Sequence, residues 1–584
     1  MIADYSPGED QSAFQIPAVR RLLEDVEPAK VEGIREAPRA NRLPLLAELV
    51  GVNQRELLVM LSNGLGLTAL DRVEADTEAA DRIPLRMILR YQAVPIHPPK
   101  GWEGVFCMAT SWPPEETMRQ WLYAAVRREI AFFLVLPEKL NSHLTERFGV
   151  GSESLDDPEM QALLDNPDQQ AAEEEEDENA AIIRFVNEVV AQAMRDRATD
   201  IHFEPRKEAL RIRYRIDGRL VPVPVPNNLV AYQSAIISRI KIMARLNISE
   251  KRRPQDGRIT YGSGRDEVDV RVSTLPTMYG ESVSMRLLSE QSQPTSIRDL
   301  GFIESDEEAI RQVLDLPHGI ILITGPTGSG KSTTLSAFMH RIGTPERRVI
   351  TVEDPIEYEI PQVNQTQVNH EIGLTFASAL RSVLRQDPDV IMVGEIRDRE
   401  TADIAVRASL TGHLVLSTLH TNDAPGAITR LIDMEIEPFL IASSVEMVIA
   451  QRLVRRLCQS CAERDEVDPR YLRSCLLALG VPPEEEQYAH GIKKPNGCED
   501  CRHLGFRGRI GLFEILRVDD SVHDLIYEQA SAREIRKRAL QYGMRTMQSC
   551  AWDHAKHGLT SLPEIMRYAD LAADEEPAAR PSPE

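Results

Sequence analysis

A glycine-rich segment that ends in a lysine and a serine carries the clearest chemical pattern in the sequence. It fits G-x-x-x-x-G-K-[S/T] and consists of Gly325, Pro326, Thr327, Gly328, Ser329, Gly330, Lys331 and Ser332, followed by Thr333. The apolar run 320–323 precedes it and the helix-compatible segment 333–339 follows it, and this context argues against a chance match. Backbone N–H groups of such a loop surround a phosphate at a helix N-terminus. We expect Lys331 to reach the β- and γ-phosphates of a nucleotide and Ser332 to bind Mg²⁺.

Residues with acid–base chemistry follow three further apolar runs. Glu353 follows residues 349–352, Glu395 closely follows residues 390–393, and His420 lies just past another run. One carboxylate is needed for Mg²⁺ and another to orient or deprotonate the attacking water. A lone histidine is usually a packing residue, but His420 would lie where a side chain could sense the γ-phosphate.

These runs have the length of buried strands and are separated by enough chain for helical crossovers. Such alternation predicts a mostly parallel sheet with helices on its faces. Ligands bind beyond the carboxyl ends of the strands in such sheets, so the phosphate loop and the three acid–base residues should meet there.

Two C-x-x-C pairs, Cys458 with Cys461 and Cys498 with Cys501, are separated by 36 residues. Four thiolates suit tetrahedral Zn²⁺, because each pair supplies two ligands from one tight turn. The gap is longer than in a compact zinc ribbon, so spacing alone leaves a redox pair and buried thiols as alternatives. No strand–helix pattern of the thioredoxin type lies near either pair, which disfavours the redox alternative.

Four segments together resemble the secretion ATPase superfamily that powers type II secretion and type IV pilus assembly. Residues 325–334 resemble its Walker A motif, 351–358 its aspartate box, 384–398 its atypical Walker B motif and 411–424 its histidine box. The resemblance extends over about residues 180–570 and includes three upstream blocks: 200–205, 251–258 and 269–276.

The resemblance implies roles that spacing does not give. Glu353 would polarise the water and Glu395 would act on Mg²⁺, although the two roles could be divided differently. Arg271 and Arg286 match arginines that reach the nucleotide phosphates from the preceding domain, where an arginine stabilises transition-state charge only when the domains close. Further core arginines of the family match Arg381, Arg385 and Arg397. The implied cofactors are ATP, Mg²⁺ and, at the four cysteines, a structural Zn²⁺ of the assembly and secretion ATPases.

The first 150 residues resemble the family's docking domain loosely, through residues 85–96. Some members bind cyclic di-GMP there through an Arg-Leu-Gly-x-x-Leu element. In this sequence Arg42 and Leu43 are followed by Pro44 instead of glycine, which argues against cyclic di-GMP binding. The alternative is an ordinary helix start with Pro44 in its first turn.

The composition is acidic, with 68 Lys+Arg against 91 Asp+Glu and a net charge of −23, and this disfavours non-specific nucleic-acid binding. Twelve of the carboxylates lie between residues 151 and 178 without a lysine or arginine, so we expect a linker that is disordered for part of its length. No apolar run approaches the roughly 18 residues that span a bilayer, and the first residues do not resemble a signal peptide. We expect a cytoplasmic protein, peripheral at the inner membrane face, that associates with the membrane only through partners.

The residues and the resemblance together predict a multidomain α/β protein with a RecA-like P-loop ATPase core. Strand-like alternation in residues 210–216, followed by an Asp217-Gly218 turn, places an α+β domain before that core. The expected parts are an N-terminal α/β docking domain (1–150), an acidic flexible linker (151–179), a PAS-like α+β domain carrying the arginines (180–292), the RecA-like core (293–456), a tetracysteine zinc module (457–505), a C-terminal helical region (506–570) and a disordered tail (571–584).

These inferences predict an ATP-hydrolysing motor that drives type II secretion, and the resemblance implies that it forms a homohexamer. Its N-terminal domain would dock on an inner-membrane platform protein and that protein's cytoplasmic partner. Type IV pilus assembly is the alternative, because both systems share every motif named above. A DNA-transfer ATPase would need a basic channel with stacking aromatics, and aromatics make up 5% of the chain with no such stripe. The intact phosphate loop and both glutamates argue against a catalytically silent scaffold.

Overall fold

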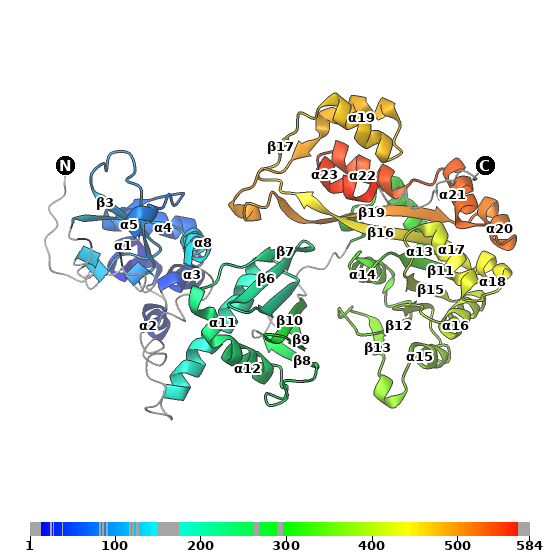
Figure 1. Ribbon diagram of the computed structural model, residues 1–584, viewed down its shortest axis with the longest axis horizontal. Helices are drawn as coiled ribbons and strands as arrows, with labels where there is room; N and C mark the ends of the chain where they lie inside the picture. Colours follow the sequence, from blue (N-terminus) through cyan, green and yellow to red (C-terminus); the bar gives the residue numbers. More distant parts are fainter. Residues whose placement is uncertain are drawn as a thin grey trace, which may run out of the picture. The chain divides into compact units, whose positions relative to one another are not determined.

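The chain folds into two compact units, residues 1–288 and 289–584 (Figure 1). The computed structural model describes residues 13–148, 174–261, 268–288 and 296–569, with gaps in the first range at 24–25, 27, 38, 81–82, 84–86, 89–90, 116–117, 120–121, 124–125 and 127. The predicted disordered tail and most of the predicted acidic linker lie outside the described residues. Among the described residues, no helix combines the length and the apolar character needed to cross a bilayer.

The N-terminal part of the first unit is α/β. Its sheet has the strand order β1 (Thr68–Ala69), β4 (Ile130–Leu134), β3 (Phe106–Thr110) and β2 (Ala93–Ile96). The helices with it are α1 (Pro17–Leu22), α2 (Pro28–Glu36), α3 (Arg39–Val50), α4 (Gln54–Leu65), α5 (Thr77–Ala80) and α8 (Pro137–Phe148).

The expected helix start at Pro44 is wrong, because α3 begins at Arg39 and Pro44 lies in its interior. The buried guanidinium of Arg39 donates to the carbonyl oxygens of Trp112 (2.8 Å) and Pro113 (2.9 Å). These hydrogen bonds hold the first residue of α3 in place, five residues before Pro44.

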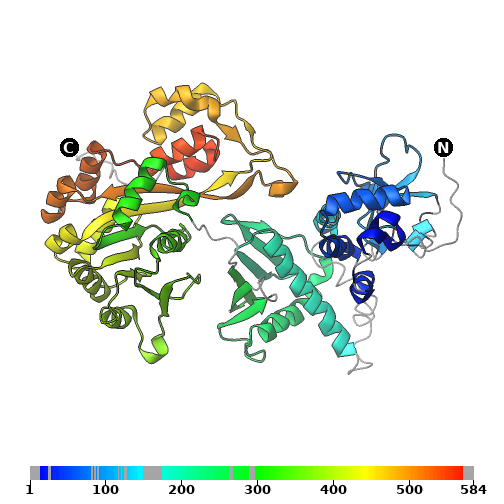
Figure 2. The ribbon, with the colours of Figure 1, turned by 180° about the vertical axis from the view of Figure 1, so that it is seen from behind.

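The second part of this unit is the predicted α+β domain. Its antiparallel six-stranded sheet has the order β7 (Arg219–Pro222), β6 (Leu210–Ile216), β5 (Asp200–Pro205), β10 (Gly280–Leu288), β9 (Val268–Thr277) and β8 (Gln255–Tyr261). Apolar side chains alternate along the strands and form one core with α11 (Glu174–Arg195) and α12 (Gln233–Met243), which cover one sheet face (Figure 2). The other face carries arginines and carboxylates.

Helix α11 begins inside the segment that we expected to be a flexible linker. Residues 174–178 are helical, whereas the expected linker ended at residue 179. Glutamate has a high helix propensity, and carboxylates near a helix N-terminus interact favourably with the helix dipole. The apolar face from Ile182 onward therefore propagates a helix backwards into the acidic run.

The second unit is built on a seven-stranded sheet that is parallel except at one edge. The strand order is β13 (Val363–Gln367), β12 (Val349–Glu353), β14 (Val390–Val393), β15 (Leu414–Leu419), β11 (Gly319–Thr324), β16 (Val445–Leu457) and β19 (Phe506–Arg517), and β19 is antiparallel to β16. One face packs on α13 (Glu304–Leu314) and α14 (Lys331–Ile342). The opposite face packs on α15 (Phe376–Val383), α16 (Arg399–Leu410), α17 (Ala424–Asp433) and α18 (Pro438–Ser444).

The region expected to be C-terminal and helical, 506–570, begins with the 12-residue strand β19. That strand pairs with β16 and so completes the seven-stranded sheet of the second unit. The helices that follow it are α20 (Asp520–Tyr527), α21 (Ala532–Gln541), α22 (Met547–Lys556) and α23 (Leu562–Ile565), and they share the core of the α15–α18 face.

Candidate nucleotide and zinc sites

The phosphate loop connects β11 to the N-terminus of α14, as predicted. Gly328 and Gly330 have φ of +80° and +91°, which a residue with a side chain rarely adopts. A Cβ atom on Gly330 would also lie 2.8 Å from Nε2 of Gln451. The Lys331 ammonium donates to the carbonyl oxygens of Gly325 (2.8 Å) and Pro326 (3.1 Å), so it is folded back over the loop. Burial lowers the pKa of Lys331.

Glu353 is the last residue of β12, and two neutral groups hold its carboxylate. Its Oε1 accepts hydrogen bonds from Thr351 Oγ1 (2.6 Å) and Gln365 Nε2 (2.9 Å). Burial raises the pKa of Glu353, although both hydrogen bonds act in the opposite direction. A carboxylate whose pKa is raised is a better proton acceptor than an ordinary glutamate.

Glu395 lies just past β14 and faces cationic and ionisable partners. Its carboxylate pairs with the Arg397 guanidinium, and its Oε2 lies 3.4 Å from His420 Nε2. It also attracts the Lys331 ammonium. The neighbouring Gly394 packs against the end of β12, where an added Cβ would lie 3.5 Å from the Cα of Glu353. The structure therefore brings the phosphate loop, both glutamates and the histidine to one edge of the sheet.

Strand register explains why these residues meet. Val352 of β12 pairs with Val393 of β14, Val393 pairs with Ser417 of β15, and Leu419 of β15 pairs with Thr324 of β11, so the four strands end within two residues of one another. Parallel strands in register place their following loops side by side.

The sequence analysis did not identify two residues that lie at the phosphate loop. Gln451 and Arg452 of β16 support the loop from behind: Gln451 Oε1 accepts from Thr334 Oγ1 (2.9 Å), and a Cβ on Gly325 would lie 3.2 Å from Nη1 of Arg452. Two long polar side chains inside the apolar run 447–454 were the signal that could have revealed them.

The three core arginines named with the resemblance have different surroundings. Arg397 contacts Glu395, Arg381 pairs with Glu400, and Arg385 donates to the backbone of Arg381 (2.9 Å). Of these, the structure brings Arg397 to a predicted site residue.

Arg271 and Arg286 belong to the first unit, where they form part of a row across its sheet. Arg286 of β10 is the cross-strand partner of Arg271 on β9 and of Asp200 on β5. The Arg286 Nε donates to Oδ1 of Asp200 (3.0 Å), and Arg258 on β8 is the next member of the row. A nearly buried carboxylate therefore fixes Arg286 beside Arg271 on the face that α11 and α12 leave open.

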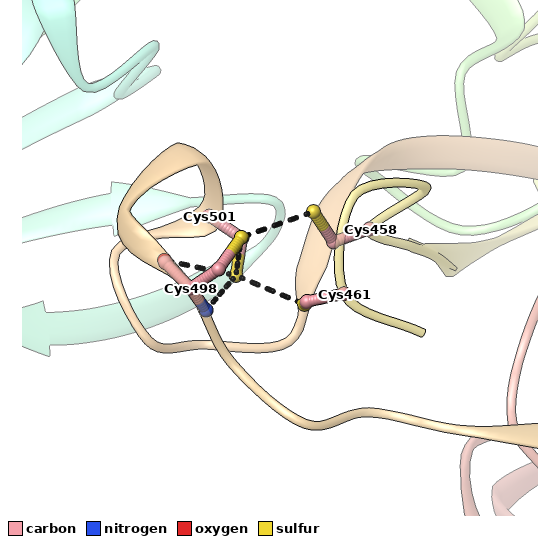
Figure 3. Close-up of side chains that lie close together, drawn as sticks. All are labelled: Cys458, Cys461, Cys498 and Cys501. Atoms are coloured by element: carbon pink, nitrogen blue, oxygen red, sulfur yellow. Dashed lines mark hydrogen bonds between the residues drawn. The ribbon is translucent and has the colours of Figure 1, made fainter. Parts of the chain in front are cut away.

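The four cysteines lie where β16 ends and β19 begins (Figure 3). Their sulfur atoms all lie within 4.8 Å of one another, and the pairs Cys458–Cys498 and Cys461–Cys501 are 3.8 and 3.7 Å apart. Four sulfurs at about 2.3 Å from a central zinc stand about 3.8 Å from one another, so the cluster fits a tetrahedral ion. Backbone N–H groups of Cys498 and Gly505 donate to Cys501 Sγ (both 3.2 Å). Amide donors of this kind stabilise a thiolate.

The remaining cysteines are buried, in keeping with packing roles: Cys107, Cys475 and Cys550.

A cavity of about 580 Å³ in the second unit contains none of the predicted site residues. Basic side chains outnumber acidic ones in its lining, and they include Arg298, Arg456 and Arg545. It is therefore distinct from the strand-end site.

Comparisons with known proteins agree with the motifs. Residues 175–567 match the family model of the "Type II/IV secretion system protein", and residues 63–154 match the MshEN domain. Type II secretion system protein E of Pseudomonas aeruginosa is 44% identical over 453 residues, which cover 78% of this chain and 86% of that protein. Type II secretion system ATPase E of Vibrio cholerae is 48% identical over 389 residues, which cover 67% and 75%.

The type IV pilus assembly ATPase PilB of Thermus thermophilus is 50% identical over 388 residues, or 66% of this chain. The matched region spans 43% of that protein's length. Among solved structures, the ATPase DotB of Legionella pneumophila is 22% identical with a TM-score of 0.48, over 67% of this chain and 96% of that chain.

The predicted fold class is confirmed: an α/β P-loop core follows an α+β domain, and an α/β domain of the MshEN type precedes both. The family match covers more than half of the chain and includes the phosphate loop, both strand-end glutamates and the four cysteines. The chain belongs to the type II/IV secretion system protein family.

Proposed function

We propose that this protein hydrolyses ATP and uses the energy to drive type II protein secretion. The observation that carries the proposal is the meeting of Lys331, Glu395 and His420 at the carboxyl edge of one parallel sheet, with Glu353 on the adjacent strand. A nucleotide triphosphate needs such a combination of cation, metal-binding carboxylate and base.

Each residue has a role that its surroundings support. The loop amides and Lys331 would bind the phosphates, Lys331 exchanging its two carbonyl partners for phosphate oxygens. Ser332 and Glu395 would hold Mg²⁺, which neutralises charge on the phosphates when bound. Glu353 would orient and deprotonate the attacking water, and His420 would contact the γ-phosphate.

The working form that we propose is a homohexamer at the cytoplasmic face of the inner membrane. Arg271 and Arg286 would reach the phosphates when domains close, and the N-terminal domain would dock on a platform protein and its cytoplasmic partner. The relatives named as secretion proteins support this proposal, and the 50%-identical PilB supports type IV pilus assembly as the second candidate. We expect neither nucleic acid nor cyclic di-GMP as a ligand.

The test is ATP turnover of the purified protein and of Lys331→Ala. The wild type should release phosphate, and Lys331→Ala should lose at least about 100-fold in kcat, because one preorganised charge-stabilising group contributes that much. Lys207→Ala, an exposed lysine in the first unit, should keep wild-type turnover and serves as the matched control. Full turnover of a folded Lys331→Ala variant would remove the assignment.

The transport system can be identified in the organism that carries the gene. A strain expressing only the Lys331→Ala variant should accumulate proteins that the parent strain exports while its surface pili remain normal. Loss of pili with normal export would favour pilus assembly instead.

A further inference from the structure

The loop between β15 and α17, residues 420–423, is held by side chains from several other elements. His420 lies against Glu395 beyond β14, and the backbone N–H of Thr421 donates to Oγ1 of Thr324 at the end of β11 (2.8 Å). Nη2 of Arg452 on β16 donates to Oδ1 of Asn422 (3.1 Å). The loop 420–423 thus contacts β11, which leads into the phosphate loop, and the neighbouring strand β16.

The last loop residue, Asp423, connects to the C-terminal helices. Its Oδ1 caps α17 by accepting from the N–H of Gly426 (2.9 Å), and its other oxygen pairs with Arg536 on α21. Arg536 Nη1 also donates to Oε2 of Glu514 on β19 (3.1 Å), and Oε1 of Glu514 accepts from the N–H of Ala424 (3.0 Å). One guanidinium therefore bridges two carboxylates at the N-terminus of α17.

Burial makes this bridge rigid. The side chain of Glu514 is 2% exposed, while Arg536 and Asp423 are 19% and 21% exposed. Without Arg536, the carboxylates of Asp423 and Glu514 would repel each other, and Glu514 would lose its cationic partner in a place that water scarcely reaches. Asp423 could reduce that repulsion by moving, and the loop that carries His420 would move with it.

We propose that Glu514 and Arg536 are positioning residues for ATP hydrolysis: they fix the loop 420–423, and with it His420, at the phosphate loop. The inference rests on the proposed function. Both residues act through Asp423 and the start of α17. Because Arg536 belongs to α21, a shift of α21 would move Asp423 and the loop 420–423 with it. The position of the C-terminal helices would in this way affect the geometry of the nucleotide site.

The test compares Arg536→Ala with Arg533→Ala, an exposed arginine on the same helix. Arg536→Ala should lower kcat about tenfold or more and leave the KM for ATP within about threefold, because a small misplacement of a catalytic group costs rate more than binding. Arg533→Ala should match the wild type. Arg536→Lys should recover part of the loss, since an ammonium keeps the charge without the two-pronged bridge.

Hydrogen–deuterium exchange supplies a readout that needs no turnover. Peptides covering residues 420–426 should exchange faster in Arg536→Ala than in the wild type, and equally in Arg533→Ala. If Arg536→Ala does not fold, Glu514→Gln and Arg536→Lys keep the packing and decide the question through the same two measurements. If the folded variants keep the wild-type kcat and the wild-type exchange rate, the inference is overturned. If the wild type shows no ATP turnover, the proposed function is overturned. The exchange measurement then still decides whether Arg536 holds the loop 420–423 in place.

Discussion

The two strand-end glutamates differ in the partners of their carboxylates. Glu353 is held by the neutral Thr351 hydroxyl and Gln365 amide, and burial raises its pKa. Glu395 faces Arg397, His420 and the Lys331 ammonium. A carboxyl group with a raised pKa suits proton transfer. A carboxylate that faces cationic groups lies where a divalent metal ion could also bind. The surroundings thus favour Glu353 as the base and Glu395 as the magnesium ligand.

The pH dependence of turnover should report the ionisation of Glu353. Hydrolysis needs its carboxylate, so kcat should fall as the pH falls through its pKa, at a higher pH than for an ordinary glutamate. Thr351→Val removes a hydrogen bond that lowers this pKa and should move the acidic limb of the kcat–pH profile further upward. Thr351→Ser keeps the hydroxyl and should restore the wild-type limb. An unchanged limb in Thr351→Val would show that another group controls it.

Among the elements, the pair β16 and β19 links the nucleotide site to the cysteine cluster. Gln451 and Arg452 of β16 back the phosphate loop, and the same strand runs on to Leu457, next to Cys458. The strand β19 starts five residues after Cys501. The segment 458–505 connects these two strands. A zinc ion at the four sulfurs would therefore hold the end of β16 next to the start of β19.

Zinc removal should act on stability first. The purified protein should contain about one zinc per chain, and Cys498→Ser should lower both the zinc content and the Tm, because a structural zinc site contributes directly to folding. Metal analysis and thermal unfolding measure the two effects. Cys475→Ala, in α19 (Pro469–Ala478) but outside the cluster, is the matched control and should keep its zinc. Full zinc content in Cys498→Ser would rule out the four-cysteine site.

At the scale of the whole molecule, the residues predicted to act on the nucleotide come from both units. The phosphate loop lies in the second unit, and the row of Asp200, Arg286 and Arg271 lies on an open sheet face of the first. Arginines that arrive from a separate domain stabilise transition-state charge only in the closed state. Under the proposed function, hydrolysis would therefore depend on movement of the two units toward each other.

Arg286→Ala should therefore reduce turnover without reducing nucleotide binding by the phosphate loop. We expect a loss of about 100-fold or more in kcat, within the range for a charge-stabilising arginine, measured as phosphate release and as binding of a fluorescent ATP analogue. Arg211→Ala, which pairs with Glu204 on the same sheet, should leave both values unchanged. Equal turnover in the two variants would show that Arg286 supports the structure of its own domain and does not act in hydrolysis.

The sequence by itself determined the parts of this protein whose residues are close neighbours in the chain. The phosphate loop needs eight consecutive residues, each cysteine pair needs one turn, and each strand-end glutamate follows its own apolar run, so local patterns were sufficient to predict them. The family followed from the same motifs. The helical state of residues 174–179 was not predicted, because a helix that forms in an apolar segment can extend into a charged one.

Tertiary structure alone decided the contacts between distant segments. That β19 completes the core sheet, that Gln451 and Arg452 lie behind the phosphate loop, and that Arg536 reaches Asp423 across 113 residues all depend on packing. A buried charge needs a partner, but the sequence does not say which oppositely charged residue will be near. Only folding brings the two charged residues together. Packing in a shared core fixes the distance between them, and their separation along the chain does not.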